Sequence, residues 1–253
     1  MPAGWSWPRC SGSEVHDLPD IAVRNLIKIY KTGPTEVLAL REVRLDVLSG
    51  EMITILGPSG CGKSTLLNMI AGLDRPNAGS ITVDGQNIVQ LGESELARYR
   101  RTGVGVVFQF FNLVPTLSAR ENIELPMRLQ GTGPSARSKR TDELLRLVKM
   151  ENRAVHRPEE LSGGEQQRIA IAVALSNDPP LILADEPTGE LDSKTGREVL
   201  EIFKMMKETQ GKTLLIVTHD ERIAKIADRT VRMMDGQVVD DRANVPASPA
   251  PSS

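Results

Sequence analysis

The chain has 253 residues, of which 40% are hydrophobic and 25% are charged, and its formal net charge is −2. This composition is near the average for a soluble globular protein and excludes a disordered or collagen-like chain. The small net charge gives no strong attraction to nucleic acid or to anionic lipid, so we expect no nucleic-acid partner.

We expect the chain to be neither exported nor inserted into a membrane. No uninterrupted apolar stretch approaches the roughly 20 residues that a membrane-spanning helix needs, and the N-terminus lacks the basic and apolar segments of a secretory signal. The two cysteines, Cys10 and Cys61, predict neither a disulfide framework nor a metal site. The expected location is the cytoplasm, and any work at a membrane would depend on a partner.

The two ends of the chain predict disordered tails. Residues 1–20 are rich in Pro, Gly and Ser, show no hydrophobic period, and contain both tryptophans, Trp5 and Trp7. These tryptophans fit a docking role, and a start of the chain that is not native explains them equally well. Residues 241–253 are also expected to be disordered, which leaves one domain over residues 21–240.

Between the tails, strand and helix patterns alternate. Alternation and β-branching predict strands over 21–30, 43–47, 52–56, 103–108, 181–184 and 213–218, and a hairpin with strands 81–83 and 87–89 around Asp84-Gly85. Helical spacing predicts helices over 64–71, 141–150, 165–175 and 194–210. Strands that alternate with helices indicate an α/β fold with a parallel sheet.

Residues 57–65 read GPSGCGKST and fit the phosphate-loop pattern G-x-x-x-x-G-K-[ST], between an expected strand and an expected helix. Lys63 should reach the β- and γ-phosphates of a nucleotide, and Ser64 should offer its hydroxyl to Mg²⁺. The alternatives are a glycine-rich turn that binds nothing and, for Cys61, a small filler residue. The expected nucleotide-binding residues here are Gly57, Pro58, Ser59, Gly60, Cys61, Gly62, Lys63, Ser64 and Thr65.

Two further strands end in chemically active side chains. Asp185 and Glu186 follow the apolar strand 181–184, at the edge of the sheet where α/β proteins bind ligands. Asp185 is expected to hold Mg²⁺ or its water shell, and Glu186 to polarise the attacking water. His219 follows the strand 213–218 and is expected at the γ-phosphate, although a lone histidine is more often structural.

Residues 161–168 read LSGGEQQR. Ser162 and Glu165 form a capping box that would open the helix 165–175. Gly163 and Gly164 each disfavour a helix by about 1 kcal/mol relative to Ala, and a cap alone does not need them. They are explained if a phosphate must approach bare backbone at this helix end.

These eight residues, after GPSGCGKST, resemble the signature of the ATP-binding subunits of ATP-binding-cassette (ABC) transporters, and the resemblance runs from about residue 21 to 240. It implies a mixed central sheet, an N-terminal antiparallel β part and a helical subdomain at about 110–162. It also implies that Gln109 senses Mg²⁺ and the γ-phosphate and that Tyr30 stacks on adenine, although an aromatic residue on a strand face is a serious alternative for Tyr30. Residues 189–192 (GELD) resemble the D-loop, usually S-A-L-D or G-N-L-D, and place Asp192 at the nucleotide. Glu190 departs from that pattern, so the role of its side chain stays open.

Three stretches are similar to a narrower group, the macrolide exporters and lipoprotein-release ATPases, with the cell-division ABC ATPase as a near neighbour. They are 72–76 (GLDRP), 108–117 (FQFFNLVPTL) and 121–126 (ENIELP). In that group ATP hydrolysis drives a permease, so the resemblance implies a peripheral position on the inner face of the cell membrane. Phe110, Phe111 and Leu113 are candidates for docking the permease or, as an alternative, for the core of the helical subdomain.

The resemblance further implies that two copies pack head to tail around two ATP. Ser162, Gly163, Gly164 and Glu165 of one copy would close over the ATP held by Lys63 of the other, as C₂ symmetry allows. Two other functions remain as alternatives. A soluble ABC protein that acts on nucleic acid is disfavoured by the single cassette and the small net charge, and a scaffold without turnover is disfavoured by Glu186 and His219.

Overall fold

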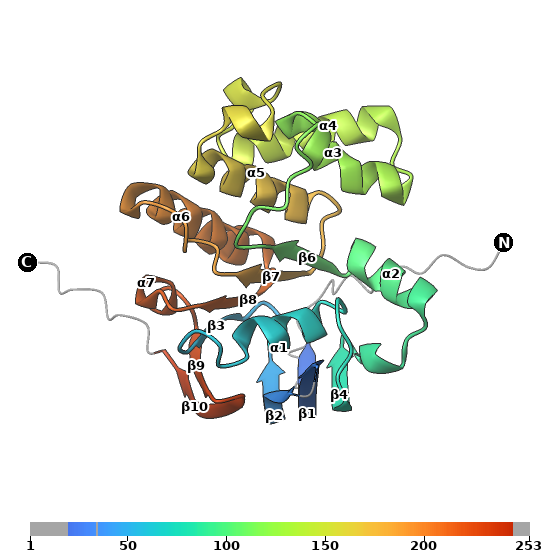
Figure 1. Ribbon diagram of the computed structural model, residues 1–253. Helices are drawn as coiled ribbons and strands as arrows, with labels where there is room; N and C mark the ends of the chain where they lie inside the picture. The colour runs from blue at the N-terminus through green and yellow to red at the C-terminus, as the bar shows by residue number, and fades with distance from the viewer. Residues whose placement is uncertain (1–19, 34, 245–253) are drawn as a thin grey trace, which may run out of the picture.

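The computed structural model describes residues 20–33 and 35–244. The chain forms two sheets and a separate group of helices, and Figure 1 shows the helices α3, α4 and α5 at one end of the molecule and the antiparallel sheet at the other. The expectations for the tails, including Trp5 and Trp7, lie outside the described residues. Within the described residues, no helix combines the length and the apolar character that crossing a bilayer requires.

The first sheet is antiparallel, with strand order β2-β1-β4-β5. Its strands are β1 (Ile21–Thr32), β2 (Thr35–Val47), β4 (Ala78–Val83) and β5 (Gln86–Asn87). The hairpin at Asp84-Gly85 is confirmed, and both residues have the positive φ that a tight hairpin turn needs. The expected strand 87–89 is wrong beyond Asn87, because Ile88–Gln90 is a 3₁₀ turn that the Asn87 side chain caps and that buries Ile88.

The second sheet has strand order β10-β9-β3-β8-β7-β6. Its strands are β3 (Met52–Leu56), β6 (Val104–Val107), β7 (Leu181–Asp185), β8 (Thr213–Thr218), β9 (Arg229–Met234) and β10 (Gln237–Ala243). All neighbours in it are parallel except β9 and β10. Strand β10 continues to Ala243, so the ordered domain extends past the expected boundary at residue 240. The carboxyl ends of β6, β7 and β8 meet at one edge.

The helices fall into two groups. Beside the sheets lie α1 (Lys63–Ile70), α2 (Glu93–Thr102), α6 (Ser193–Gln210) and α7 (Glu221–Ala224). The helical group comprises α3 (Ala119–Gln130), α4 (Pro134–Leu147) and α5 (Gly163–Leu175), with 3₁₀ turns at Glu151–Arg153 and Pro158–Glu160. Helices α3 and α4 and both 3₁₀ turns lie within the region expected to form a helical subdomain, about 110–162. Helix α5 begins just past that region and packs against α3 and α4, so the helical group extends further than expected.

Two hydrophobic cores hold the central sheet from opposite sides. Leu183 and Leu215 belong to the core between the two sheets, where α1 packs against β2, β7 and β8. Ile182 and Leu214, one position earlier on the same strands, belong to the core under α5 and α6, together with Phe203. Because both faces are covered, β7 and β8 are continuously apolar, and their first polar side chains come at the strand ends.

Candidate nucleotide-binding site

The phosphate loop joins β3 to α1, as its sequence predicts. Gly62 is the N-cap of α1 with φ of 101°, and no side chain caps this helix end. A Cβ on Gly62 would lie 2.5 Å from the carbonyl oxygen of Ala39. Gly62 is therefore fixed both by its left-handed backbone and by close packing, and the first N–H groups of α1 have no acceptor within the helix.

A cavity of ≈ 430 Å³ lies in front of this helix end. The strand ends of the parallel sheet contribute Gln109, Glu186 and His219 to its lining, although these residues are far apart in the chain. The loop and α1 contribute Ser59, Gly60, Gly62, Lys63, Ser64 and Thr65. The fold thus brings to one cavity nine of the residues that the sequence assigns to nucleotide binding and catalysis. Four other assigned residues of the loop and the strand end do not line it: Gly57, Pro58, Cys61 and Asp185.

Lys63 is a buried cation inside the cavity. Its side chain is 7% exposed, and its Nζ donates to the carbonyl oxygens of Gly57 at 2.8 Å and Pro58 at 3.0 Å. The carboxylate of Glu186 lies 4.0 Å from the same ammonium group. The charge is therefore held at the mouth of the loop by two neutral acceptors, where an anion can compete for it.

Ser64 and Asp185 form the oxygen pair that the sequence predicts for a metal. The Ser64 hydroxyl donates to the Asp185 carboxylate at 2.9 Å. Burial raises the pKa of Asp185, the charge of Glu186 adds to this rise, and the Ser64 hydrogen bond and Lys63 oppose it. A desolvated carboxylate of this kind gains most when a cation binds beside it.

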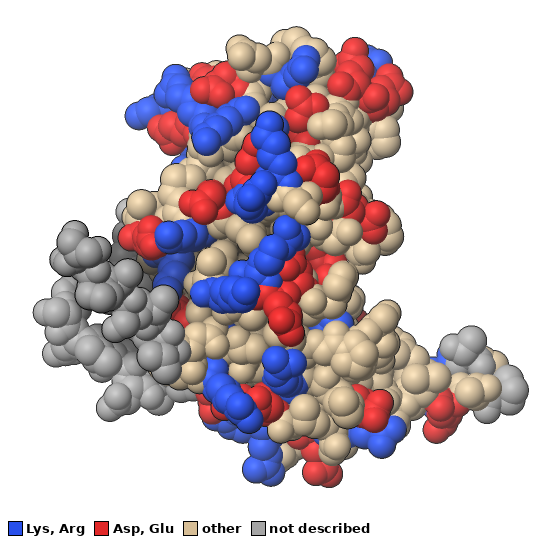
Figure 2. All heavy atoms as spheres, turned by 90° about the vertical axis from the view of Figure 1, so that its left-hand side faces the viewer, with Lys and Arg blue, Asp and Glu red and all other residues tan. Residues whose placement is uncertain are grey.

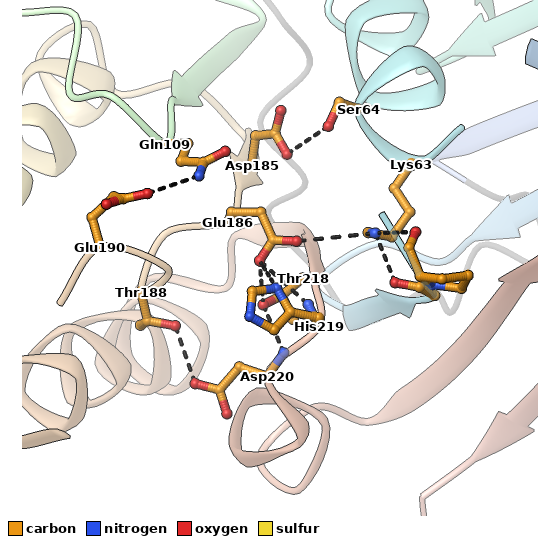
Figure 3. A network of polar contacts seen from close by, with 12 residues as sticks. Lys63, Ser64, Gln109, Asp185, Glu186, Thr188, Glu190, Thr218, His219 and Asp220 are labelled. Atoms are coloured by element: carbon orange, nitrogen blue, oxygen red, sulfur yellow. Dashed lines mark hydrogen bonds and ion pairs between the residues drawn. The ribbon is translucent and has the colours of Figure 1, made fainter. Parts of the chain in front are cut away.

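Glu186 is held by the end of the neighbouring strand β8. Its carboxylate accepts hydrogen bonds from the Thr218 hydroxyl at 2.9 Å and from the His219 amide at 3.3 Å, and its other close neighbour is His219 Nδ1 at 3.0 Å (Figure 3). Its backbone has φ of 45°, a strained conformation for a residue other than glycine, of the kind that clusters at functional sites. The side chain of His219 is 71% exposed to the cavity mouth.

Sequence reasoning missed four residues that support this constellation. Thr218 fixes the Glu186 carboxylate, and its place directly before His219 at the end of a buried strand could have indicated it. Asp220 caps α7 and accepts a hydrogen bond from the Thr188 hydroxyl at 3.1 Å. The Arg222 guanidinium beside Asp220 lowers the pKa of that carboxyl. These bonds tie the end of β8 to the turn after β7.

Tyr30, the expected adenine platform, lies on β1 outside the cavity lining. It is 37% exposed, its hydroxyl donates to Asp74 at 3.0 Å, and the Lys28 ammonium lies 4.8 Å from its ring centre. Burial and Asp74 raise the pKa of Tyr30, and a hydrogen bond with Thr65 opposes the rise. Tyr30 therefore adjoins α1 and offers a partly open ring, and its stacking role stays a prediction.

The signature turn lies apart from the cavity of its own chain. The capping box is confirmed: Ser162 caps α5 and accepts from the Glu165 amide, and the Glu165 carboxylate accepts from the Ser162 amide at 2.8 Å. This backbone bond is the main cause that lowers the pKa of Glu165. None of the residues Ser162, Gly163, Gly164 and Glu165 lines the cavity.

The two signature glycines differ in their surroundings. A Cβ on Gly164 would lie 1.9 Å from Cγ2 of Thr195, so packing of α5 against α6 alone requires a glycine there. A Cβ on Gly163 would meet only Cζ of Phe111, at an ordinary 3.7 Å. Packing against Thr195 is therefore enough to explain Gly164. The approach of a phosphate stays a prediction for Gly163.

Asp192 is placed as the N-cap of α6. Its carboxylate accepts from the amides of Lys194 at 2.9 Å and Thr195 at 3.1 Å and from the Thr195 hydroxyl at 2.6 Å, which lowers its pKa. It does not line the cavity. A role at the nucleotide is thus a prediction for Asp192, whereas capping of α6 is its observed contact.

The oxygen atoms beside the cavity are suitable ligands for Mg²⁺. Ser64, Asp185 and Gln109 supply hydroxyl, carboxylate and amide oxygens, the hard ligands that this ion prefers. No cluster of three or more His, Cys, Asp or Glu side chains suited to a metal exists among the described residues. A single carboxylate with space for phosphate oxygens is what Mg²⁺ uses at nucleotide sites, and a closed protein cage is not expected there.

A phosphate loop and two strand ends, one with an acidic residue and one with a histidine, surround one cavity. This arrangement defines a nucleotide-binding cassette. Residues 40–189 match the family model described as ABC transporter. The chain belongs to the ABC transporter family and is its ATP-binding cassette, the ATPase unit. The expected fold class is confirmed.

One relative is similar to this chain both in sequence and in a solved structure. The ABC transporter ATP-binding protein MJ0796 of Methanocaldococcus jannaschii is 46% identical over 222 residues, or 86% of this chain and 94% of the relative. Its structure as a dimer in a post-hydrolysis state with ADP and Pi matches with a TM-score of 0.83 at 44% identity, covering 88% of this chain and 98% of that one.

Two further relatives carry the names of lipoprotein-release and macrolide-export systems, the narrower group that the sequence resembles. The lipoprotein-releasing system ATP-binding protein LolD of Geobacter metallireducens is 46% identical, covering 87% of this chain and 98% of the relative. The macrolide export ATP-binding/permease protein MacB of Brucella abortus is 44% identical over 88% of this chain, which spans 34% of that protein.

Proposed function

We propose that two copies of this chain enclose ATP head to tail and that its hydrolysis drives a membrane permease. The observation that carries this proposal is the separation of two half-sites on one chain. Lys63 and Glu186 lie in the cavity, whereas the signature turn stands outside it, with an exposed Ser162 and room at Gly163. The dimer of MJ0796 with ADP and Pi supports the same arrangement.

In the proposed reaction, Lys63 binds the β- and γ-phosphates and stabilises the charge that develops on them. Glu186 orients the attacking water and accepts its proton, and Thr218 keeps the reacting carboxylate in place. His219 would contact the γ-phosphate from the cavity mouth. Mg²⁺, bound by Ser64, Asp185 and Gln109, would neutralise phosphate charge. The first turn of α5 in the other copy would supply free N–H groups.

The test of this proposal is complementation between two inactive variants. Lys63→Ala removes the phosphate contact in the cavity, and Gly163→Asp places a negative charge on the signature turn of the other half-site. Each variant alone should lose ATP turnover by about 100-fold or more. A mixture forms dimers with one intact composite site and should regain turnover. Full activity of Gly163→Asp alone would contradict the proposal.

For the permease, we infer docking at the segment that follows Gln109. Phe110 is 71% exposed. Phe111 lies against the signature turn, and Leu113 packs on the core under α5 and α6, so Phe110 is the residue free to meet a partner. A groove of ≈ 420 Å³ begins nearby, with lining side chains that include Phe108, Leu125 and Leu129. An apolar permease segment fits this surface.

Phe110→Asp tests the docking surface. Because Phe110 is exposed, the variant should fold and hydrolyse ATP as the unmodified chain does, while transport by the reconstituted complex with its permease falls about tenfold or more. Lost folding would show that Phe110 belongs to the core. Unchanged transport with normal assembly would place the docking surface elsewhere.

The charges of the molecule favour a permease partner over nucleic acid. Figure 2 shows Lys and Arg interspersed with Asp and Glu over the face that it presents, without a continuous basic surface. The name of MacB, an ATP-binding/permease protein, supports a permease partner, and we infer that the cassette works at the cytoplasmic face of the cell membrane beside it. Lipoprotein and macrolide are two candidate cargoes, and the permease would select between them.

A further inference from the structure

Glu190, the residue that departs from the usual D-loop pattern, contacts a residue of the cavity. The Nε2 of Gln109 donates to its carboxylate at 3.1 Å (Figure 3). Gln109 follows β6, and Glu190 lies on the turn between Glu186 and Asp192, so the bond joins segments 81 positions apart. It is a contact between the expected metal ligand and the turn behind the expected catalytic base.

The turn that carries Glu190 is fixed on its other side. The Gly189 amide donates to the Glu186 carbonyl at 3.0 Å, and the Thr188 hydroxyl donates to Asp220 at 3.1 Å. A Cβ on Gly189 would lie 3.9 Å from Nε2 of Gln109, so the amide group of Gln109 packs directly on this turn. Glu190 therefore presents its carboxylate from a braced position.

The chemistry of this contact fixes which way round the Gln109 amide lies. A carboxylate only accepts hydrogen bonds, whereas the amide has a donor end and an acceptor end. The NH₂ end must therefore face Glu190, and the carbonyl oxygen is left on the opposite side. In Figure 3 that oxygen lies on the side of Asp185, whose carboxylate bonds to Ser64. This is the orientation that a cation ligand needs.

We propose that Glu190 is a positioning residue that orients the Gln109 amide so that its carbonyl oxygen joins Ser64 and Asp185 as a metal ligand. The inference rests on the proposed function, which places Mg²⁺ at these three residues. Outer groups that orient a metal ligand typically change metal affinity by about 10–100-fold when they are removed. Glu190 thereby links the D-loop to the metal through one hydrogen bond.

The test measures Mn²⁺ binding by electron paramagnetic resonance in the presence of a non-hydrolysable ATP analogue. Glu190→Ala should weaken Mn²⁺ binding about tenfold, whereas binding of the analogue without metal stays unchanged. Glu190→Gln should retain most of the affinity, because its own amide oxygen accepts the same hydrogen bond. Glu190→Lys, which can only donate, should turn the Gln109 amide over and lose at least as much as Glu190→Ala.

The matched control is Glu201→Ala, which removes an exposed carboxylate from α6 and should bind Mn²⁺ as the unmodified chain does. If the unmodified chain binds no Mn²⁺ with the analogue, the proposed metal site itself is wrong. If it binds Mn²⁺ and Glu190→Ala binds equally well, the proposed function stands and the role of Glu190 is overturned. An equal loss in Glu190→Gln and Glu190→Ala would also overturn it.

A second readout needs no metal. The side-chain NH₂ signals of Gln109 can be identified by their absence from the ¹⁵N spectrum of Gln109→Ala. In the nucleotide-free protein, Glu190→Ala should shift these signals and speed their hydrogen exchange, and Glu190→Gln should restore slow exchange. Signals that are the same in the unmodified chain and in Glu190→Ala would contradict the hydrogen bond that the inference requires.

Discussion

The phosphate loop and the signature turn are both helix N-termini rich in small residues, yet they lie in opposite surroundings. The first turn of α1 has no side-chain cap and faces a cavity lined by Gln109, Glu186 and His219. The first turn of α5 is capped by Ser162, lies outside that cavity, and ends at the surface. One helix end is surrounded by reactive groups of its own chain, and the other meets none of them.

This difference indicates that the two copies contribute different parts of one nucleotide site. The capping box uses the amides of Ser162 and Glu165, while the first N–H groups of α5 have no partner within the helix. They can bind an anion only if another molecule brings one. The account therefore predicts that changes at the α1 site act on chemistry within a chain, and that changes at the α5 turn act between chains.

The largest expected effect is on hydrolysis. Glu186→Gln keeps the shape of the side chain but removes the proton acceptor, so ATP turnover should fall about 100-fold or more. Because the ATP is then not consumed, a dimer should accumulate with Mg-ATP, as measured by light scattering after gel filtration. Asp240→Asn, a carboxylate on β10 away from the cavity lining, is the control and should behave as the unmodified chain. A strictly monomeric Glu186→Gln protein at saturating Mg-ATP would count against a nucleotide site shared between two copies.

A smaller effect separates the two signature glycines. Gly164→Ala places a Cβ 1.9 Å from Cγ2 of Thr195 and should lower the free energy of unfolding by about 1–3 kcal/mol. Gly163→Ala has space and should leave stability nearly unchanged. Thr195→Ser, which removes Cγ2 and keeps the hydroxyl that bonds to Asp192, should rescue Gly164→Ala. Denaturant unfolding measures all three, and equal stability of the two glycine variants would show that the close packing is not real.

The smallest effect concerns Asp185 and depends on pH. Its pKa is raised in the folded chain by burial, so the folded state favours the protonated acid. That stabilisation is present below the ordinary pKa of aspartate and is lost as pH rises through the raised value. At neutral pH, Asp185→Asn should therefore raise the melting temperature of the nucleotide-free protein by about 1–2 °C.

The gain should shrink as the pH falls toward the ordinary pKa of aspartate, while Mg²⁺-dependent nucleotide binding is lost. Thermal unfolding between pH 4 and 8 checks this dependence. A lower melting temperature of Asp185→Asn at neutral pH would mean that the carboxylate contributes more through its bonds than its burial costs.

The sequence predicts the phosphate loop, the acidic strand end and the capping box because each is a local pattern with one physical cause. It does not predict α2, in which only Leu96 and Tyr99 are buried, because so polar a segment carries no clear helical period. Nor does it predict β9 and β10. Strand β10 consists of partly buried and exposed residues and has no fully buried position.

Contacts between distant segments account for the rest of the site. The bond between Gln109 and Glu190 and the packing of Gly164 on Thr195 depend on how β6, α5 and α6 meet in space. No local spacing signals either one. The sequence suggested that Gly164 leaves space for a phosphate, whereas the structure shows that it leaves space for Thr195. A glycine that fits a ligand and a glycine that fits a neighbouring helix look alike in sequence.

The most direct test of the account is a crystal structure of Glu186→Gln with Mg-ATP. The account predicts a symmetric dimer in which the triphosphate held by Lys63 and Ser64 of one copy is also contacted by Ser162 and the Gly163 amide of the other. An ATP bound wholly within one copy, with the signature turn of every copy free of nucleotide, would contradict the account.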